Sequence, residues 1–310
     1  MEFSHKSVLL QECIDALNIR PDGIYLDGTL GGAGHSLEIC RRLESGRLIG
    51  VDRDTVALEA AKSRLAGHLE KVTLVHDNFE NIDSILDSLG IEKIDGMLFD
   101  LGVSSPQLDD GARGFSYMAD APLDMRMNRE DSLTAYEVVN TWPREELKRI
   151  LFEYGEERYA PLIAAAIERT RAEHPIETTL ELVDIIKAAM PDKALREKQH
   201  PAKRSFQAIR IAVNDELGAV SRMMKSAVDR LNVGGRLAVI TFHSLEDRIV
   251  KSAMAEAARG CTCPPEFPVC VCGKKPKIEI VTRKPIVSGT EELEENPRAR
   301  SAKLRVAERL

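Results

Sequence analysis

Residues 24–54 read IYLDGTLGGAGHSLEICRRLESGRLIGVDRD, and this stretch decides the fold. A short apolar run ends in Asp27 and is followed by a glycine-rich turn over residues 28–35. Apolar residues then recur at helical spacing over residues 37–43, and a second apolar run ends in Asp52. The pattern predicts a strand, a glycine turn, a helix and a second strand that closes on an acid.

The glycine turn predicts a ligand site. Glycine lets the backbone turn tightly and lie against a ligand without a Cβ in the way. The helix that starts there points free N–H groups at the ligand. An acid at the tip of the second strand, here Asp52, can accept hydrogen bonds from both hydroxyls of a ribose. The first prediction is therefore a nucleoside-bearing cofactor, and the alternative is a glycine-rich turn in a sheet that binds no ligand.

Asp27 distinguishes between classes of nucleoside cofactor. The dinucleotide fingerprint is G-x-G-x-x-G, and it places a pyrophosphate at the turn, where a preceding carboxylate is unfavourable. A cofactor that carries an ammonium and a sulfonium tolerates or favours that carboxylate. The turn from Asp27 to His35 resembles the S-adenosylmethionine site of Rossmann-like methyltransferases.

Length, composition and charge limit the class of protein. The chain has 310 residues, enough for one large domain or two ordinary ones, and its 43% of hydrophobic residues can form a sizeable core. A net charge of −7 excludes a globally basic nucleic-acid binder but not a local basic patch. No signal-peptide pattern and no run of about 18 apolar residues is found, so we expect a cytoplasmic protein.

A third strand tip is expected beside the first two. The apolar run at residues 72–75 leads into Asp77 and Phe79. An acid or amide there can bind an adenine amino group, and an aromatic ring can cover the face of the base. The alternative for Phe79 is a buried anchor of the loop.

A fourth strand, residues 94–100, ends in Asp100 and leads into a loop that contains Ser104, Ser105 and Gln107. This loop leaves the carboxyl end of a central strand, where open α/β sheets bind ligands. A plain turn is the alternative for the Ser-Ser-Pro segment.

The alternation of strand and helix stops between residues 111 and 205, where apolar residues recur at intervals of three and four. We therefore expect an all-helical insert over 111–205 within a discontinuous α/β core of residues 1–110 and 206–310. A fifth strand is expected at 236–241, and two short strands follow near the end of the chain. A closing antiparallel pair after five α/β units is the layout of methyltransferase sheets rather than dinucleotide-binding sheets.

Basic residues are dense between residues 193 and 210, with His200 and Phe206 among them and a single acid, Glu197. A basic patch with an aromatic residue, in an acidic protein, is typical of phosphate binding. The alternative is a solvated helix face. The basic residues of this segment that we take as candidate contacts are Lys198, Lys203, Arg204 and Arg210.

Four late cysteines form two C-x-C pairs, and two earlier cysteines, Cys13 and Cys40, lie in apolar helical patterns typical of a core. Four thiolates at this spacing can hold a tetrahedral zinc ion, which would be structural because no coordination position stays open. The alternatives are reduced thiols or a redox pair. The four late cysteines are Cys261, Cys263, Cys270 and Cys272.

Taken together, five segments resemble the bacterial 16S ribosomal RNA cytosine-N4 methyltransferases, the RsmH or MraW family. The segments are residues 5–10, 27–35, 100–107, 206–210 and 241–247. The resemblance covers nearly the whole chain and implies a Rossmann-like class I S-adenosylmethionine-dependent methyltransferase sheet with an inserted all-helical domain. It does not imply zinc, because the cysteine cluster is not part of the family pattern.

The resemblance also implies the reaction. S-Adenosylmethionine would be the donor, and the N4 amine of a cytosine in the decoding centre (P-site region) of 16S rRNA in the 30S subunit would be the acceptor, with no membrane or DNA partner. The residues that it implies as donor contacts are Ala33, Gly34, His35, Asp52, Phe79, Asp100 and Gln107.

Methyl transfer from a sulfonium needs alignment and acceptors for the amine hydrogens more than covalent help. We expect the loop from Asp100 to Gln107 to supply them through backbone carbonyls and the hydroxyl of Ser104 or Ser105, and the basic segment to grip the RNA backbone. The base must be single-stranded or flipped out to enter. Two other functions stay open: a ribosome-assembly factor without enzymatic activity, and an amino-methyltransferase of DNA.

Overall fold

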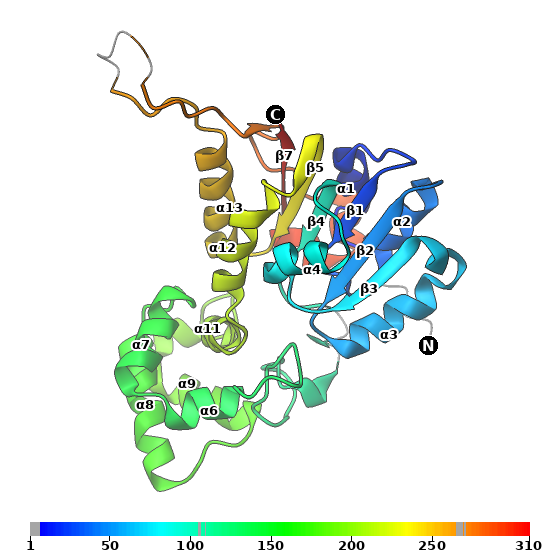
Figure 1. Ribbon diagram of the computed structural model, residues 1–310. Coiled ribbons are helices and arrows are strands. Elements are labelled where there is room, and N and C mark those ends of the chain that lie inside the picture. Colours follow the sequence, from blue (N-terminus) through cyan, green and yellow to red (C-terminus); the bar gives the residue numbers. More distant parts are fainter. Residues whose placement is uncertain (1–6, 105–106, 109, 265–268, 270) are drawn as a thin grey trace. The chain divides into compact units, whose positions relative to one another are not determined.

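The computed structural model shows a chain that divides into two compact units. Unit 1 comprises residues 1–102 and 217–310, and unit 2 comprises residues 103–216 (Figure 1). The structure describes residues 7–104, 107–108, 110–264, 269 and 271–310.

Unit 1 is built on one seven-stranded sheet with the strand order β3-β2-β1-β4-β5-β7-β6 (Figure 1). The first five strands in this order are parallel, and β7 pairs antiparallel with both β5 and β6. The strands are β1 (Ile24–Asp27), β2 (Arg47–Asp52), β3 (Val72–His76), β4 (Ile94–Asp100), β5 (Leu231–Thr241), β6 (Ile278–Ile280) and β7 (Lys303–Arg309). The α/β fold class and the closing antiparallel strands predicted from the sequence are confirmed.

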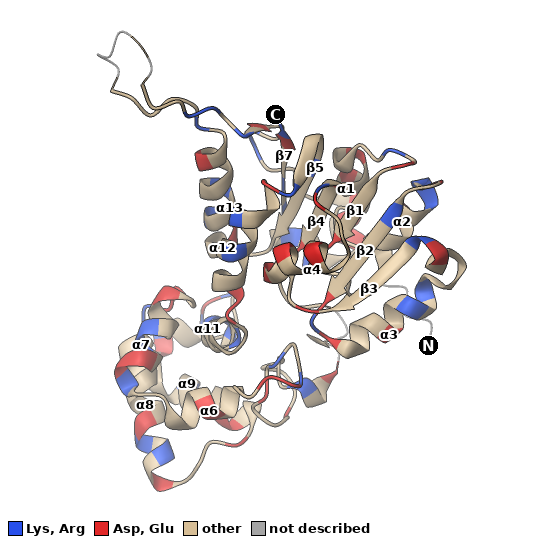
Figure 2. Ribbon diagram, in the orientation of Figure 1, with Lys and Arg blue, Asp and Glu red and all other residues tan. Residues whose placement is uncertain are grey.

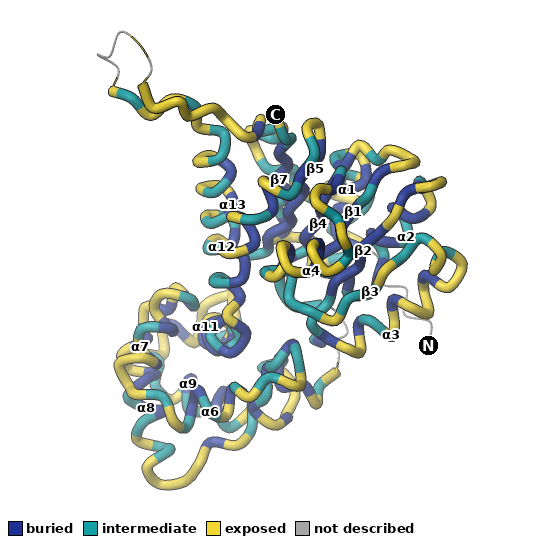
Figure 3. The backbone as a smooth tube through the Cα atoms, viewed as in Figure 1, coloured by how far each residue is buried: buried dark blue, intermediate teal, exposed yellow. Residues whose placement is uncertain are grey.

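Helices cover both faces of this sheet. One face packs against α4 (Ile82–Ser88), α12 (Glu216–Ala227) and α13 (Ser244–Ala257), whose buried side chains share a core with Met97 and Phe99. The other face packs against α1 (Leu10–Leu17), α2 (Gly34–Arg42) and α3 (Thr55–Arg64). The central strands are therefore apolar on both sides, as parallel strands between two helical layers are (Figure 3).

Short helices complete unit 1. They are η1 (Ala66–Lys71), η2 (Phe79–Asn81), α14 (Thr290–Glu295) and η4 (Pro297–Ser301). In the described part of the chain, no helix combines the length and the apolar composition that a membrane span requires.

Unit 2 is helical, and its helices pack around a core of their own. Its elements are η3 (Gly111–Arg113), α6 (Ala135–Thr141), α7 (Arg144–Glu153), α8 (Ala160–Glu173), α9 (Thr179–Ala189), α10 (Asp192–Leu195) and α11 (Lys203–Asn214). Thr134 begins α6 with a capping box in which the Glu137 carboxylate accepts from the Thr134 backbone N–H at 3.0 Å.

Unit 2 is longer than the insert expected over residues 111–205. The extension includes α11, because Phe206, Ile209 and Val213 recur at helical spacing and are buried in the helical core. Asp215, with a φ of 47°, ends α11 and separates it from α12.

Candidate active site

Three acids end three adjacent parallel strands of unit 1. Asp27 is the last residue of β1, Asp52 of β2 and Asp100 of β4. Because β1 pairs in parallel with both β2 and β4, the three carboxyl groups lie along the same edge of the sheet. The strand order reverses on either side of β1 and β4, which is where open α/β sheets bind ligands.

The glycine turn ties the tip of β1 to both neighbouring strands. The Gly28 N–H donates to the Leu98 carbonyl at 2.9 Å, and the Leu30 N–H donates to the Val51 carbonyl at 3.0 Å. The hydroxyl oxygen of Thr29 accepts from the Asp100 backbone N–H at 2.6 Å. The turn therefore lies across the carboxyl ends of the strands, and Thr29 is a positioning residue that the sequence pattern did not reveal.

Two positions of the turn restrict which residues fit there, one through close packing and one through its backbone conformation. A Cβ at Gly28 would lie 2.2 Å from the Phe99 ring, so no side chain fits there. Ala33 has a φ of 54° and immediately precedes α2. The first turn of α2 therefore begins at the edge that carries the three acids, with its N–H groups directed toward that edge.

Asp52 is held in place by backbone N–H groups. One carboxylate oxygen accepts from Gly31 at 2.8 Å, and the other accepts from Asp54 at 2.9 Å. Burial raises the pKa of Asp52 to about 6, although these two hydrogen bonds oppose the shift. Each oxygen keeps a lone pair, so the carboxylate can still accept from ribose hydroxyls.

Asp27 is buried beneath the turn. Its carboxylate accepts from the Ser36 hydroxyl at 2.7 Å and from the Thr29 N–H at 3.2 Å. Burial raises the pKa of Asp27 to about 6, and the nearby charge of Asp52 adds to the shift. Ser36 lies in the first turn of α2, so this hydrogen bond also fixes the start of the helix against β1.

Asp100 has the most perturbed carboxyl group of the three. Burial is the largest cause, and the charges of Asp27 and Glu246 add to it, so that the pKa of Asp100 rises to about 8. Its Oδ1 atom is buried and has no hydrogen-bond partner among the described residues. A buried oxygen of this kind, at the ligand edge of the sheet, indicates a group kept for a bound molecule.

Phe79 follows β3 and is both anchored and partly exposed. Its ring packs edge-on against Phe99, with centroids 5.8 Å apart and planes at 64°. Asp77, the other candidate at this tip, accepts from the Asn78 N–H and the Asn81 side-chain amide, each at 2.7 Å. The structure therefore supports the anchor interpretation of Phe79, and the residue as a whole stays partly exposed after the strand tip.

Gly34 and His35 lie against the N-terminal segment. A Cβ at Gly34 would lie 1.9 Å from the Ser7 hydroxyl oxygen, and the buried His35 ring has its Nε2 3.0 Å from the Val8 carbonyl oxygen. These contacts give both residues a structural role in fixing that segment to α2. A donor contact by either residue stays a prediction.

Ser104 and Gln107 belong to unit 2, and Ser105 lies outside the described residues. Gln107 is buried, and its side-chain oxygen accepts from the Ser104 N–H at 3.0 Å. The loop is therefore closed by its own glutamine, and the acceptor role predicted for its serines is untested.

The candidate phosphate contacts of unit 2 divide into exposed and paired residues. Lys198, Lys203 and Arg204 are exposed, whereas Arg210 forms a bidentate ion pair with the buried Glu216 at 2.8 and 3.0 Å. The charge of Arg210 is thus already balanced within unit 2. Figure 2 shows basic and acidic residues close together along α7, where Lys148 pairs with Glu145 and Arg149 pairs with Glu146 and Glu153.

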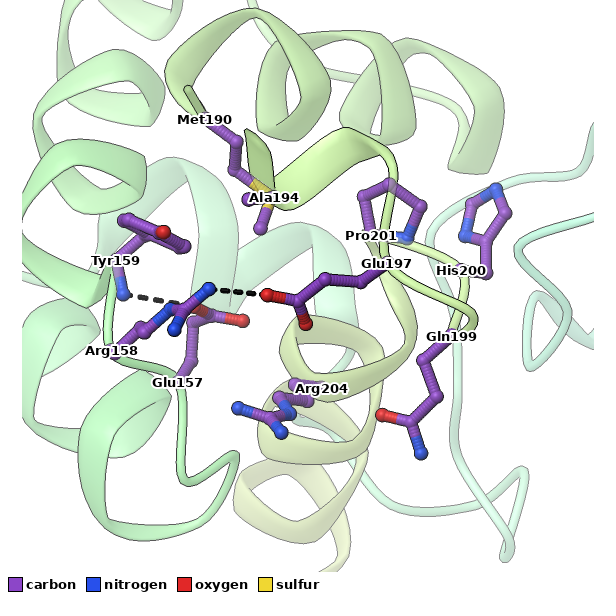
Figure 4. A pocket seen from close by; sticks show the side chains of 10 residues that line it. All are labelled: Glu157, Arg158, Tyr159, Met190, Ala194, Glu197, Gln199, His200, Pro201 and Arg204. Carbon is purple, nitrogen blue, oxygen red and sulfur yellow. Dashed lines mark hydrogen bonds and ion pairs between the residues drawn. The ribbon is translucent and has the colours of Figure 1, made fainter. Parts of the chain in front are cut away.

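Aromatic side chains near this segment differ from the expectation. Phe206 is only 3% exposed and belongs to the helical core, so it presents no ring to a ligand. His200 instead stacks on Tyr117, with centroids 4.6 Å apart. His200 also lines a pocket in which Arg158 and Glu197 form an ion pair beside Arg204 (Figure 4).

The sulfur atoms of Cys261, Cys263 and Cys272 all lie within 4.8 Å of one another, whereas Cys270 lies outside the described residues. Cys13 and Cys40 are fully buried, which confirms the core role predicted for them.

Comparisons with known proteins identify the family of the chain. The profile of the MraW methylase family matches residues 2–310. The chain belongs to this family. The match covers residues of both units.

Curated members of the family are highly similar to this chain. A protein of Clostridium botulinum (strain Kyoto / Type A2) is 60% identical over 100% of both chains. Proteins of Lachnospira eligens and Brevibacillus brevis are 57% and 56% identical over 100% of this chain and 99% of their own length. All three carry the name "Ribosomal RNA small subunit methyltransferase H".

Proposed function

We propose that this methylase transfers the methyl group of S-adenosylmethionine to the N4 amine of a cytosine in the decoding centre (P-site region) of 16S rRNA. The shared name of the relatives supports small-subunit ribosomal RNA as the substrate. The choice of the N4 amine and of the decoding centre rests on the sequence resemblance, and a cytoplasmic location rests on the apolar pattern of the sequence.

The observation that carries the donor assignment is the unpartnered oxygen of Asp100 in a cluster of acids. Three carboxyl groups with raised pKa values share one edge of the sheet. Burial is the largest cause of each raised pKa, and the charge of a neighbouring acid adds to it. A cation bound there favours the charged form of all three. When bound, S-adenosylmethionine supplies a methyl group activated by its sulfonium, and its positive charges fit this edge better than a pyrophosphate would.

The residues around this edge have surroundings that fit the donor contacts implied by the resemblance. Asp52 would accept from the ribose hydroxyls, since backbone N–H groups already fix its orientation. Phe79, which is partly exposed, would cover the adenine. At the start of α2, Gly34 and His35 would offer backbone N–H groups to polar atoms of the donor, and Ala33, whose own N–H donates to the Leu30 carbonyl at 2.7 Å, would line the site.

Residues of unit 2 would hold the acceptor. We assign the amine hydrogens to backbone carbonyls of the loop and to the hydroxyl of the serine at 104 or 105, and we assign Gln107 to a contact with the donor. The exposed Lys198, Lys203 and Arg204 would contact RNA phosphates, and the paired Arg210 would contribute less. The base would have to leave any stacked helix to reach the methyl group.

The test is transfer of tritiated methyl groups to small ribosomal subunits from a strain that lacks the enzyme, followed by mass analysis of the nucleosides. The proposal predicts one N4-methylated cytidine, formed by the wild type and not by Asp100→Asn. Binding of the donor without any transfer would favour an assembly factor, and transfer to duplex DNA instead of subunits would favour a DNA amino-methyltransferase. Either result would overturn the proposal.

A further inference from the structure

The segment between α13 and β6 makes a long excursion from unit 1. It begins after Ala257, the last residue of α13, and ends at Lys277, just before β6, where the Lys277 N–H donates to the Ala257 carbonyl at 2.8 Å. The two ends of the excursion therefore lie next to each other in unit 1.

This excursion has no apolar core in its described part. None of the described residues from 258 to 277 is buried, and Val269 and Val271 are 70% and 72% exposed (Figure 3). Burial of apolar surface is what normally holds a segment of this length in one conformation. A segment without it needs another constraint, such as a disulfide or a metal ion.

Three thiols lie at the base of the excursion, close enough to share one ion. The sulfurs of Cys261 and Cys272 are 3.7 Å apart, and Cys263 completes a set in which all sulfurs lie within 4.8 Å. A disulfide would hold two sulfurs about 2.05 Å apart. Two thiolates on a tetrahedral zinc, each with a Zn–S distance of about 2.3 Å, lie about 3.8 Å apart. The observed separation therefore matches metal ligands.

Backbone N–H groups point at each of the three sulfurs. Cys263 donates to the Cys261 sulfur at 3.4 Å, Thr262 donates to the Cys272 sulfur at 3.4 Å, and Val271 donates to the Cys263 sulfur at 3.3 Å. Hydrogen bonds to sulfur favour the thiolate, which is the form that binds a metal.

The geometry of this cluster leads us to propose that Cys261, Cys263 and Cys272 bind a structural zinc ion that holds the excursion in its folded form. Thiolates select zinc over the oxygen-preferring magnesium and calcium. Cys270, the fourth ligand predicted from the sequence, lies outside the described residues, and the proposal rests on the other three. The site is distinct from the carboxyl edge and takes no part in methyl transfer.

Cys40 provides a matched control. It is fully buried in α2, and burial raises the pKa of its thiol to about 11, so it is neutral at pH 7. An alanine in its place removes one thiol from the protein, as alanine at position 261 or 272 does, and leaves the cluster intact.

The first test is the metal content of tag-free protein, measured by mass spectrometry of the elements. The wild type and Cys40→Ala are expected to hold one zinc per chain, and Cys261→Ala and Cys272→Ala to hold none. Replacement of zinc by Co²⁺ should give the visible bands of tetrahedral cobalt and a thiolate charge-transfer band only in the wild type and in Cys40→Ala. A wild type that takes up no zinc, or variants that keep it, would overturn the proposal, as would a disulfide between Cys261 and Cys272.

The second test asks whether the ion holds the excursion. Trypsin can cut after Arg259 and Lys274, which are exposed, whereas Pro276 blocks cleavage after Lys275. Removal of zinc with a strong chelator should speed these cuts in the wild type, and Cys272→Ala should be cut fast with or without chelator. Equal cutting of the wild type in both conditions would contradict a structural role. Donor binding measured on the same samples should stay unchanged.

Discussion

Asp95 and Asp100 lie near opposite ends of β4, and their surroundings differ completely. At the amino end, the Asp95 carboxylate accepts from the Arg20 guanidinium, from the Asn232 amide at 2.8 Å and from the Ile24 N–H at 2.9 Å. At the carboxyl end, one oxygen of Asp100 is buried without a partner in the described part of the chain.

The difference separates an acid that stabilises the fold from an acid kept for a ligand. Cations and N–H groups compensate the charge of Asp95, whereas the neighbours of Asp100 are the acids Asp27 and Glu246. An ionised Asp100 therefore costs stability in the free protein, and a cationic ligand can recover that cost on binding. The predictions below test this contrast.

The largest effect is expected for Asp100→Asn. The amide keeps the shape of the side chain but removes the charge that we assign to the donor site, so methyl transfer should fall by about 10²–10³-fold. The variant should fold about as stably as the wild type at pH 7, because a pKa of about 8 leaves the Asp100 carboxyl mostly protonated, and so uncharged, in the free protein. Steady-state transfer and urea unfolding measure the two quantities, and retained activity would remove Asp100 from the site.

The opposite pattern is expected for Asp95→Asn. Loss of this charge weakens the hydrogen bonds from Arg20 and Ile24, so the free energy of unfolding should fall by about 1–3 kcal/mol. Transfer per folded molecule should match the wild type. If this variant loses activity without losing stability, the two ends of β4 do not differ as proposed.

The pH dependence of stability gives a third contrast. The folded-state pKa of Asp100 is about 8, above the usual carboxyl value of 3.8, so the stabilising effect of protonation is full below pH 4 and is lost as the pH rises toward 8. The free energy of unfolding of the wild type, relative to that of Asp100→Asn, should therefore fall as the pH rises from 4 to 8, by at most about 1.4 kcal/mol per pH unit. Above pH 8 the difference should stay constant. Urea unfolding from pH 5 to pH 9 measures the difference, and a constant difference would contradict the raised pKa.

A smaller effect, on RNA binding, is expected for unit 2. There the Arg210 guanidinium is paired with Glu216, whereas the Lys203 side chain is exposed. Lys203→Ala and Arg204→Ala should each weaken RNA binding a few-fold and reduce the salt slope of the affinity by about 1. Arg210→Ala should mainly lower stability, because it leaves Glu216 buried without its cation. Filter binding over a salt series checks this, and equal slopes for all variants would exclude these residues as phosphate contacts.

The sequence predicted the parts of this site that depend on chain order. Strand tips follow from apolar runs that end in acids, and parallel pairing then brings Asp27, Asp52 and Asp100 to one edge. The hydrogen bond between Thr29 and Asp100 was not predictable, because it joins residues 71 apart in the chain. It depends on how the turn crosses the sheet.

The sequence was less informative about unit 2 for a different physical reason. Basic residues near an aromatic suggested a binding face, but the helical spacing of Phe206 with Ile209 and Val213 places its ring in the core. The pairing of Arg210 with Glu216 spans the end of α11 and depends on the left-handed backbone at Asp215. Composition cannot distinguish a paired arginine from one that is available to RNA.

Calorimetric titration of the protein with S-adenosylmethionine tests the central claim most directly. At pH 7 the carboxyl of Asp100, with a pKa of about 8, is mostly protonated in the free protein. If the donor binds with its positive charge against this group, binding should release close to one proton, detected by titrations in buffers of different ionisation enthalpy. We predict this release for the wild type and its loss in Asp100→Asn. No donor binding by the wild type, or equal proton release by both proteins, would contradict the account.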